Sequence, residues 1–232
     1  MPTTDAMGLR IPEFFVDLPH LDDPGLLLDK LREVVDAVAA DASPSDRETL
    51  LTLYRTAYGS LLAEGAIYVG YGYFRTDDGG LSMATLNVFV KDQEEANPHL
   101  TIAQILKAHA EGGPRHAPGV SATPIELPCG PAAFVIRMTL APDDVEAVSP
   151  MAWQAQAVIP FPQGQRKVVV IDLSTPCPTE APYYAGILDA IAHTVTFTTT
   201  NPEAVQDSPD GGAGEDAADA EDPRSRISQA LG

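Results

Sequence analysis

Basic residues are scarce in this sequence. It has 14 lysines and arginines against 33 aspartates and glutamates, a formal net charge of −19 over 232 residues. A surface of this sign repels the phosphates of nucleic acids and of anionic membranes. We therefore expect neither as a ligand, whereas cations and basic partners stay open. The simpler interpretation is an acidic surface that keeps the protein in solution.

Cysteines and long apolar runs are also few. Cys129 and Cys177 are the only thiols, and no stretch reaches the roughly 18 consecutive apolar residues of a membrane-spanning helix. The first 15 residues show no basic segment followed by an apolar run, which is the pattern of a secretion signal. We therefore expect a cytoplasmic protein without membrane insertion, in which both cysteines stay reduced.

Familiar catalytic spacings are missing as well. The sequence has no G-x-S-x-G motif. Nothing next to Cys129 would lower the pKa of its thiol, although a histidine could approach it in space. The acidic pairs Asp77/Asp78 and Asp143/Asp144 lie in polar turns, where ordinary solvated carboxylates are expected. We predict no catalytic residue and no cofactor, and an enzyme is the less favoured class.

Histidines at metal-binding spacing are not found either. The nearest pair, His109 and His116, is separated by glycines and a proline that interrupt any helix between them. His20 and Asp22 could offer ligands to a cation, but a helix N-cap explains the acids at this place more simply. We predict no metal site.

Two closely spaced glycines, Gly70 and Gly72, raise the question of a nucleotide-binding loop. That loop needs a strand, a glycine turn and then a helix, with a third glycine. Here the sequence TDDGG is typical of a hairpin turn and a second alternating strand follows it. We interpret the glycines as small residues on a sheet face, where a neighbouring helix or backbone comes close.

Four helices are predicted by apolar residues at helical spacing, within residues 22–41, 43–65, 97–113 and 179–193. Asp23 before Pro24 predicts the first N-cap, and Asn97 before Pro98 predicts the third. Ser45 followed by Glu48 has the spacing of a capping box. Gly65 stands where a glycine ends the second helix.

Strands are predicted by alternation and by β-branched runs, at residues 11–19, 67–75, 81–91, 123–128, 131–140, 151–162, 166–175 and 194–198. Hairpin-linked strands dominate and no βα unit repeats. This order predicts an α+β fold, a mostly antiparallel sheet flanked by helices. We expect one domain over residues 9–200. Residues 201–232 are rich in Asp, Ala, Gly and Pro, which predicts a disordered acidic tail.

The segments MAWQAQAVIPFP, RKVVVIDLST and YYAGILDAIAHTVTF resemble the end of Mog1/PsbP-like proteins, which include LpqN-type lipoproteins. In those proteins two long antiparallel strands lead into a helix and one last strand. The hairpin DDGGLSMATLNVFV fits the same fold. The resemblance covers about 130 residues and implies an α+β protein that binds partners and is not an enzyme. It carries over no functional residue.

Aromatic side chains give one candidate ligand site. We expect them to line a cleft between the sheet and the second helix, where a pocket with polar phenol rims could bind a small ligand. The simpler interpretation is that they are core. The candidates are Tyr54, Tyr58, Tyr68, Phe74, Phe89 and Trp153.

The end of the tail gives a second candidate site. After about twenty acidic, flexible residues, the sequence regains two bases and two apolar side chains: Arg224, Arg226, Ile227 and Leu231. A tether that ends in a short amphipathic motif can dock into a partner's groove. A frayed end without a role is the simpler interpretation.

Two functions follow as expectations. The first is a non-catalytic accessory or chaperone-like factor that acts through protein contacts in a larger assembly, for example in secretion. The alternative is a small-ligand-binding protein or hydrolase that uses the aromatic cleft. The partner or ligand, the biological process and the oligomeric state are not given by the sequence.

Overall fold

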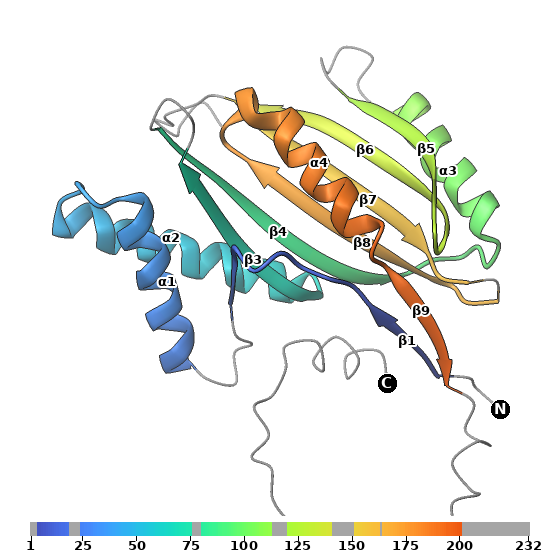
Figure 1. The fold of residues 1–232 in the computed structure, drawn as a ribbon, viewed down its shortest axis with the longest axis horizontal. Helices are drawn as coiled ribbons and strands as arrows, with labels where there is room; N and C mark the ends of the chain where they lie inside the picture. The colour runs from blue at the N-terminus through green and yellow to red at the C-terminus, as the bar shows by residue number, and fades with distance from the viewer. Residues whose placement is uncertain are drawn as a thin grey trace, which may run out of the picture.

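The computed structural model describes residues 4–18, 24–75, 80–112, 120–140, 151–162 and 164–200. Within these ranges it contains a seven-stranded sheet, a separate two-stranded sheet and four α-helices (Figure 1). Every neighbouring pair of strands is antiparallel. The α+β class predicted from the sequence is confirmed.

The large sheet is built mainly from hairpins. Its strands lie in the order β2 (Phe15–Asp17), β3 (Ala66–Arg75), β4 (Leu81–Asp92), β8 (Lys167–Thr175), β7 (Met151–Pro160), β6 (Gly130–Leu140) and β5 (Ser121–Leu127). The central strand β8 carries the apolar run Val168–Ile171, as expected of a strand covered on both faces. The first predicted strand, 11–19, is shorter than expected because only three of its residues pair with β3.

One face of the sheet is covered by α4 (Ala181–Ala192), which follows the 3₁₀ turn Pro178–Glu180 (Figure 1). Tyr184, Leu188 and Ile191 of α4 are buried against alternate residues of the strands. Leu86 on β4 and Leu173 on β8 are among them. We call this cluster the α4 core.

The opposite face is covered at two places. The helical hairpin of α1 (Pro24–Val38) and α2 (Pro44–Ala63) packs on β3, and α3 (Pro98–Gly112) contacts β5, β6 and β7. Leu31 and Val34 of α1 pack with Val69, Tyr71 and other residues in a second cluster, which we call the hairpin core. The sheet therefore separates two apolar cores.

The helix ends follow the predicted signals with one correction. Asn97 caps α3, since its Oδ1 accepts hydrogen bonds from the backbone N–H groups of His99 and Leu100. Gly65 follows α2 with a φ of 89°, which glycine adopts readily. The predicted capping box at Ser45 is wrong, because Ser43 is the N-cap of α2 and accepts from the N–H of Asp46. Pro44 then occupies the first helical position.

Gly70 and Gly72 lie within β3, and β3 pairs with β4 as predicted. What comes close to them differs from our expectation. A Cβ atom added to Gly70 would lie 2.4 Å from the Tyr68 hydroxyl, and one on Gly72 would lie 2.9 Å from the Phe15 ring. Aromatic side chains, rather than a helix or a backbone, therefore fill the space that the glycines leave.

A strand that the sequence did not indicate lies at the beginning of the described chain. β1 (Thr4–Gly8) pairs with β9 (Thr196–Thr200) in the two-stranded sheet. It starts before residue 9, where the predicted domain begins, and the side chain of Met7 is buried in the α4 core. The predicted acidic tail, residues 201–232, lies outside the described residues.

Candidate functional site

The six aromatic candidates lie on both faces of the sheet. Tyr68, Phe74 and Trp153 pack with the α4 core, whereas Tyr54, Tyr58 and Phe89 belong to the hairpin core. The structure therefore does not bring the six together in one cleft. Burial raises the pKa of Tyr54 and of Tyr68, and the nearby Asp17 adds to the shift at Tyr68. Both phenols stay protonated at neutral pH.

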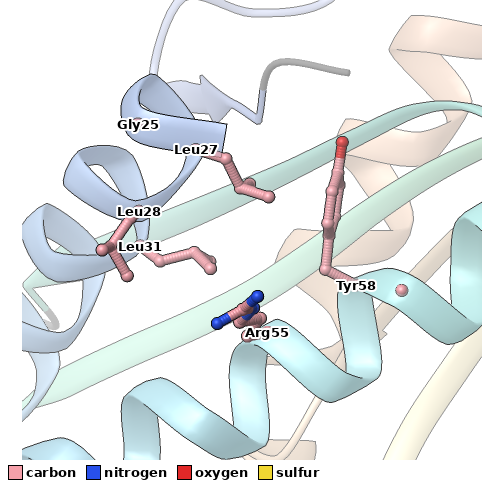
Figure 2. A pocket seen from close by; sticks show the side chains of 7 residues that line it. Gly25, Leu27, Leu28, Leu31, Arg55 and Tyr58 are labelled. Carbon is pink, nitrogen blue, oxygen red and sulfur yellow. The ribbon is translucent and has the colours of Figure 1, made fainter. Parts of the chain in front are cut away.

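One of these aromatic residues, Tyr58, lines a cleft between α1 and α2 (Figure 2). The cleft has a volume of about 510 Å³, within the range of small-ligand sites. Its wall on α1 is made of leucines, and α2 contributes a phenol, a guanidinium and a glycine. The lining residues are Gly25, Leu27, Leu28, Leu31, Arg55, Tyr58 and Gly59.

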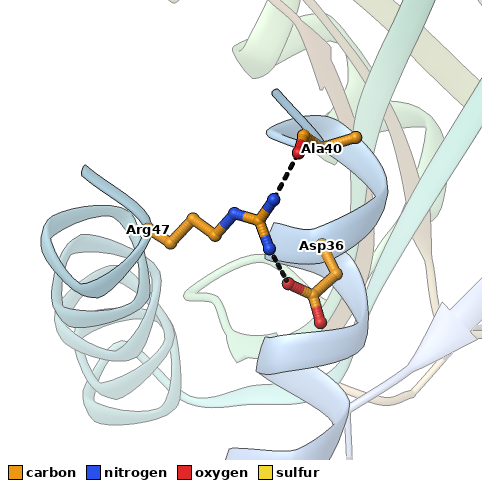
Figure 3. A network of polar contacts seen from close by, with 3 residues as sticks. All are labelled: Asp36, Ala40 and Arg47. Atoms are coloured by element: carbon orange, nitrogen blue, oxygen red, sulfur yellow. Dashed lines mark hydrogen bonds and ion pairs between the residues drawn. The ribbon is translucent and has the colours of Figure 1, made fainter. Parts of the chain in front are cut away.

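A polar clamp fixes the two helices near their connection (Figure 3). Nη1 of Arg47, in the first turns of α2, donates to Oδ1 of Asp36 over 3.2 Å. Nη2 of the same side chain donates to the carbonyl oxygen of Ala40 in the connection. These contacts hold the helices together at this end, and the cleft lies towards the other end of the hairpin, where Gly25 and Gly59 both line it.

The electrostatic character of the cleft comes from Arg55. This exposed side chain forms no ion pair with any carboxylate in the described ranges. The other titratable side chain in the lining, Tyr58, is only 1% exposed. The cleft is thus an apolar surface with a single cationic edge on an otherwise acidic protein.

A group of polar side chains lies on the face of the large sheet that also carries the hairpin core, between the α1–α2 hairpin and α3. Strand register places Asn87, Asp172 and Gln156 side by side in one row. Thr85, Ser174, Gln154 and Arg137 form the next row. We call these seven residues the polar patch.

Asp172 is the centre of the polar patch and is only 4% exposed. Its Oδ2 atom accepts hydrogen bonds from Nε2 of Gln154 over 2.5 Å and from Nε2 of Gln156 over 2.6 Å. Burial raises the pKa of Asp172, although these amides, Asn87 and the charge of Arg137 act in the opposite direction. Buried carboxyl groups with raised pKa values are frequent in functional sites.

Two other members of the polar patch are incompletely satisfied. Oδ1 of Asn87 and Nε of Arg137 are buried and have no hydrogen-bond partner among the described residues. In the second row, the Thr85 and Ser174 hydroxyls satisfy one another over 2.6 Å. The polar patch therefore combines a buried acid with an acceptor and a donor that the protein itself leaves unused.

Our reading of the sequence did not identify the polar patch. A signal was present, because polar residues recur at every second position as Thr85/Asn87, Gln154/Gln156 and Asp172/Ser174. Each pair taken alone is typical of a solvated strand face. Only the register of β4, β8 and β7 shows that the three pairs are adjacent.

The remaining candidates have local roles or lie outside the described residues. Cys129 and Cys177 are free and half-buried. Burial raises the pKa of the Cys129 thiol, which makes it a weak nucleophile at neutral pH. Nδ1 of His109 bonds the carbonyl oxygen of Ile105 within its own helix. Outside the described ranges lie His20, Asp22, Asp23, Asp77, Asp78, His116, Asp143, Asp144, Arg224, Arg226, Ile227 and Leu231.

None of the α-helices in the described ranges has both the length and the apolar character of a membrane span. In the same ranges, no three histidine, cysteine, aspartate or glutamate residues are grouped so that they could hold a metal ion.

Comparison with known proteins adds no family to these observations. No protein-family model matches the chain, and no curated protein matches its sequence. The resemblance to Mog1/PsbP-like proteins therefore stays a prediction that rests on the pattern of strands and helices.

Proposed function

We propose that this protein is a non-catalytic accessory factor that binds an apolar segment of a partner protein in the α1–α2 cleft. The observation that carries the proposal is the apolar cleft itself, which borders the hairpin core. Leu27, Leu28 and Leu31 form one wall of a space of about 510 Å³. Grooves between helices commonly receive the apolar side of an amphipathic helix.

The sequence of α2 supports this use of the cleft. Gly59 lies inside the helix, where glycine costs about 1 kcal/mol relative to alanine. A Cβ atom at this position would meet nothing within 4 Å. Packing within the described protein therefore does not require the glycine, and its absent side chain leaves the floor of the cleft free for a ligand.

Arg55 supplies the chemistry that would orient the bound segment. A guanidinium at the edge of an apolar groove favours a carboxylate, or the carbonyl groups at the end of a helix. We expect a partner segment with apolar residues at helical spacing and an acidic residue or a helix C-terminus at one end.

The lining of the cleft favours binding over catalysis. Among the residues that the structure describes, its lining contains no aspartate, glutamate, histidine, cysteine or serine. General acid–base and nucleophilic mechanisms use such side chains within hydrogen-bond distance of the reacting group. A chaperone-like role in a larger assembly is the proposal that fits these residues best.

Site-specific photo-crosslinking tests the proposal. A photo-reactive amino acid is introduced at Gly59 in the cleft or, as a matched control, at Gly186, an exposed glycine of α4 that also has open space around it. In cells that naturally make the protein, we expect a discrete protein adduct from position 59 and none from position 186. The adduct should disappear when Leu28→Asp is added.

Two results would contradict the proposal. One is the same adduct from both positions, which would indicate contact without a specific site. The other is the absence of any protein adduct from position 59 in correctly folded protein. Native mass spectrometry of the purified protein distinguishes a small molecule in the cleft from a protein segment.

A further inference from the structure

The polar patch contains buried polar atoms whose burial lowers the stability of the fold. No contact within the described residues compensates them. Four buried side-chain atoms in the described part of the chain lack a partner, and the polar patch holds two of them, Asn87 Oδ1 and Arg137 Nε. Leaving a buried polar atom without a hydrogen bond costs free energy. Asn87 is 4% exposed, so bulk water does not compensate it.

Arg137 indicates that a ligand of the polar patch would carry an anionic group. Its Nε atom has no hydrogen-bond partner, and its guanidinium group forms no ion pair, within the described residues. Its five N–H donors match a carboxylate in a bidentate arrangement. Arg137 and Asp172 influence one another electrostatically, yet they do not form an ion pair in the described structure. The two charges of the polar patch are therefore held apart.

Asp172 indicates that the same ligand would also carry a cationic group. Its carboxyl group accepts hydrogen bonds from the neutral amides of Gln154 and Gln156, and the neutral amide of Asn87 also interacts with it. A charged ammonium group is a stronger partner for a buried carboxylate than a neutral amide. The side-chain oxygens of the two glutamines and of Asn87 can accept further hydrogen bonds from such a group.

The charge of the whole protein narrows the choice of ligand. With a net charge of −19, the chain repels anions, and most strongly those with several charges, such as phosphates. A zwitterion has no net charge and avoids this repulsion. It also presents an anionic group to Arg137 and a cationic group to Asp172 at the same time.

We propose that the polar patch binds a zwitterion of the α-amino acid class, with its carboxylate on Arg137 and its ammonium group on Asp172. The side-chain amides of Gln154 and Gln156 cover Asp172 and rotate away when the ligand binds. Gln154 and Gln156 are half-buried, and their terminal amide torsions are soft. Rotation of these amides exposes Asp172 and Oδ1 of Asn87 to the ligand.

Calorimetric titration of the full chain with the common amino acids tests the proposal. Each amino acid that binds is compared with the hydroxy acid that lacks its ammonium group and with the amine that lacks its carboxylate. We expect both analogues to bind about 10- to 100-fold more weakly, since each loses one charge-assisted interaction.

Variants assign the binding to the polar patch. Arg137→Met and Asp172→Asn should each weaken binding by about 10- to 100-fold, whereas Arg32→Met at an exposed position of α1 should leave it unchanged. Hydrogen exchange of the unmodified protein gives a readout that does not depend on the folding of a variant. Adding the amino acid should slow exchange at residues 85–87 and 172–174.

Three results would overturn the proposal. They are the absence of binding by every common amino acid at millimolar concentration, equal affinity for the amino acid and its hydroxy acid, and protection by the ligand only outside the polar patch. The proposal does not depend on the α1–α2 cleft. A failed crosslink at Gly59 and a failed titration therefore test separate sites.

Discussion

Asp172 links the ionisation of one residue to the stability of the fold. Its pKa in the folded protein is raised above the ordinary value of 3.8, mainly by burial. Between these two pKa values the unfolded chain has lost the proton while the folded chain keeps it. The free energy of unfolding therefore decreases as pH rises through that interval. Above the pKa of the folded protein it decreases no further on account of this group.

Asp172→Asn should remove this pH dependence. The asparagine stays neutral and keeps an oxygen that accepts from the two glutamines. We expect the difference in unfolding free energy, variant minus wild type, to increase from pH 4 upwards and then to level off. Urea unfolding of both proteins over this pH range measures the difference, and other carboxyl groups cancel in it. A difference that is constant with pH would show that Asp172 ionises equally in both states.

Two glycines should respond to alanine in opposite directions. Gly65 has a positive φ with open space around it, so Gly65→Ala should cost about 1 kcal/mol through backbone strain alone. Gly59 has a helical backbone and equally open space, so Gly59→Ala should stabilise the protein by about 0.5–1 kcal/mol. Urea unfolding midpoints measure both effects. Similar shifts of the same sign would contradict this explanation.

At the scale of the element, β3 depends on an aromatic side chain packed over glycine. The Tyr68 ring occupies the space where Gly70 would carry a Cβ atom. Gly70→Ala should therefore destabilise the protein by about 1–3 kcal/mol through overpacking. Combining it with Tyr68→Ala should cost less than the sum of the two single changes, because the ring is then absent. Thermal unfolding of the wild type, the two single variants and the double variant measures this difference. Strictly additive effects of the two changes would contradict the prediction.

Sequence reasoning worked best for elements that carry their own signals. The four predicted helices were confirmed, because apolar spacing and caps are local features. β1 was missed because the sequence TDAMG has no strand pattern, and only its pairing with β9 makes it a strand. The polar patch was missed for the same reason, since strand register brings together residues 85 positions apart, such as Asn87 and Asp172.

The aromatic candidates show the limit of alternation as a guide. Alternation within 67–75 and 81–91 does not fix the register of the two strands, and the predicted grouping of Tyr68 and Phe89 on one aromatic face of the hairpin was wrong. It does not tell which helix covers which face. Phe89 therefore packs under the α1–α2 hairpin, while Tyr68 and Trp153 pack on the side of α4.

At the scale of the whole molecule, β1 and β9 join the two ends of the described chain. Met7 of β1 is 3% exposed and belongs to the α4 core, so β1 contributes to packing as well as to pairing. Deleting residues 1–8 should lower the melting temperature and speed hydrogen exchange in β9. Exchange in α1, which belongs to the other core, should change little. Equal acceleration in both elements would indicate that the two cores unfold as one unit.

The pairing of β1 with β9 has a practical consequence for engineering. Thr4 and Thr200 are direct partners in the ribbon, so a short glycine-rich bridge could connect them once residues 201–232 are removed. New termini could then be opened in the segment between β4 and α3, which contains no residue of the polar patch or of the described lining of the α1–α2 cleft. A circular permutant of this kind would allow a fluorescent reporter to be attached beside α3, and its folding would show that the order of synthesis does not determine the architecture.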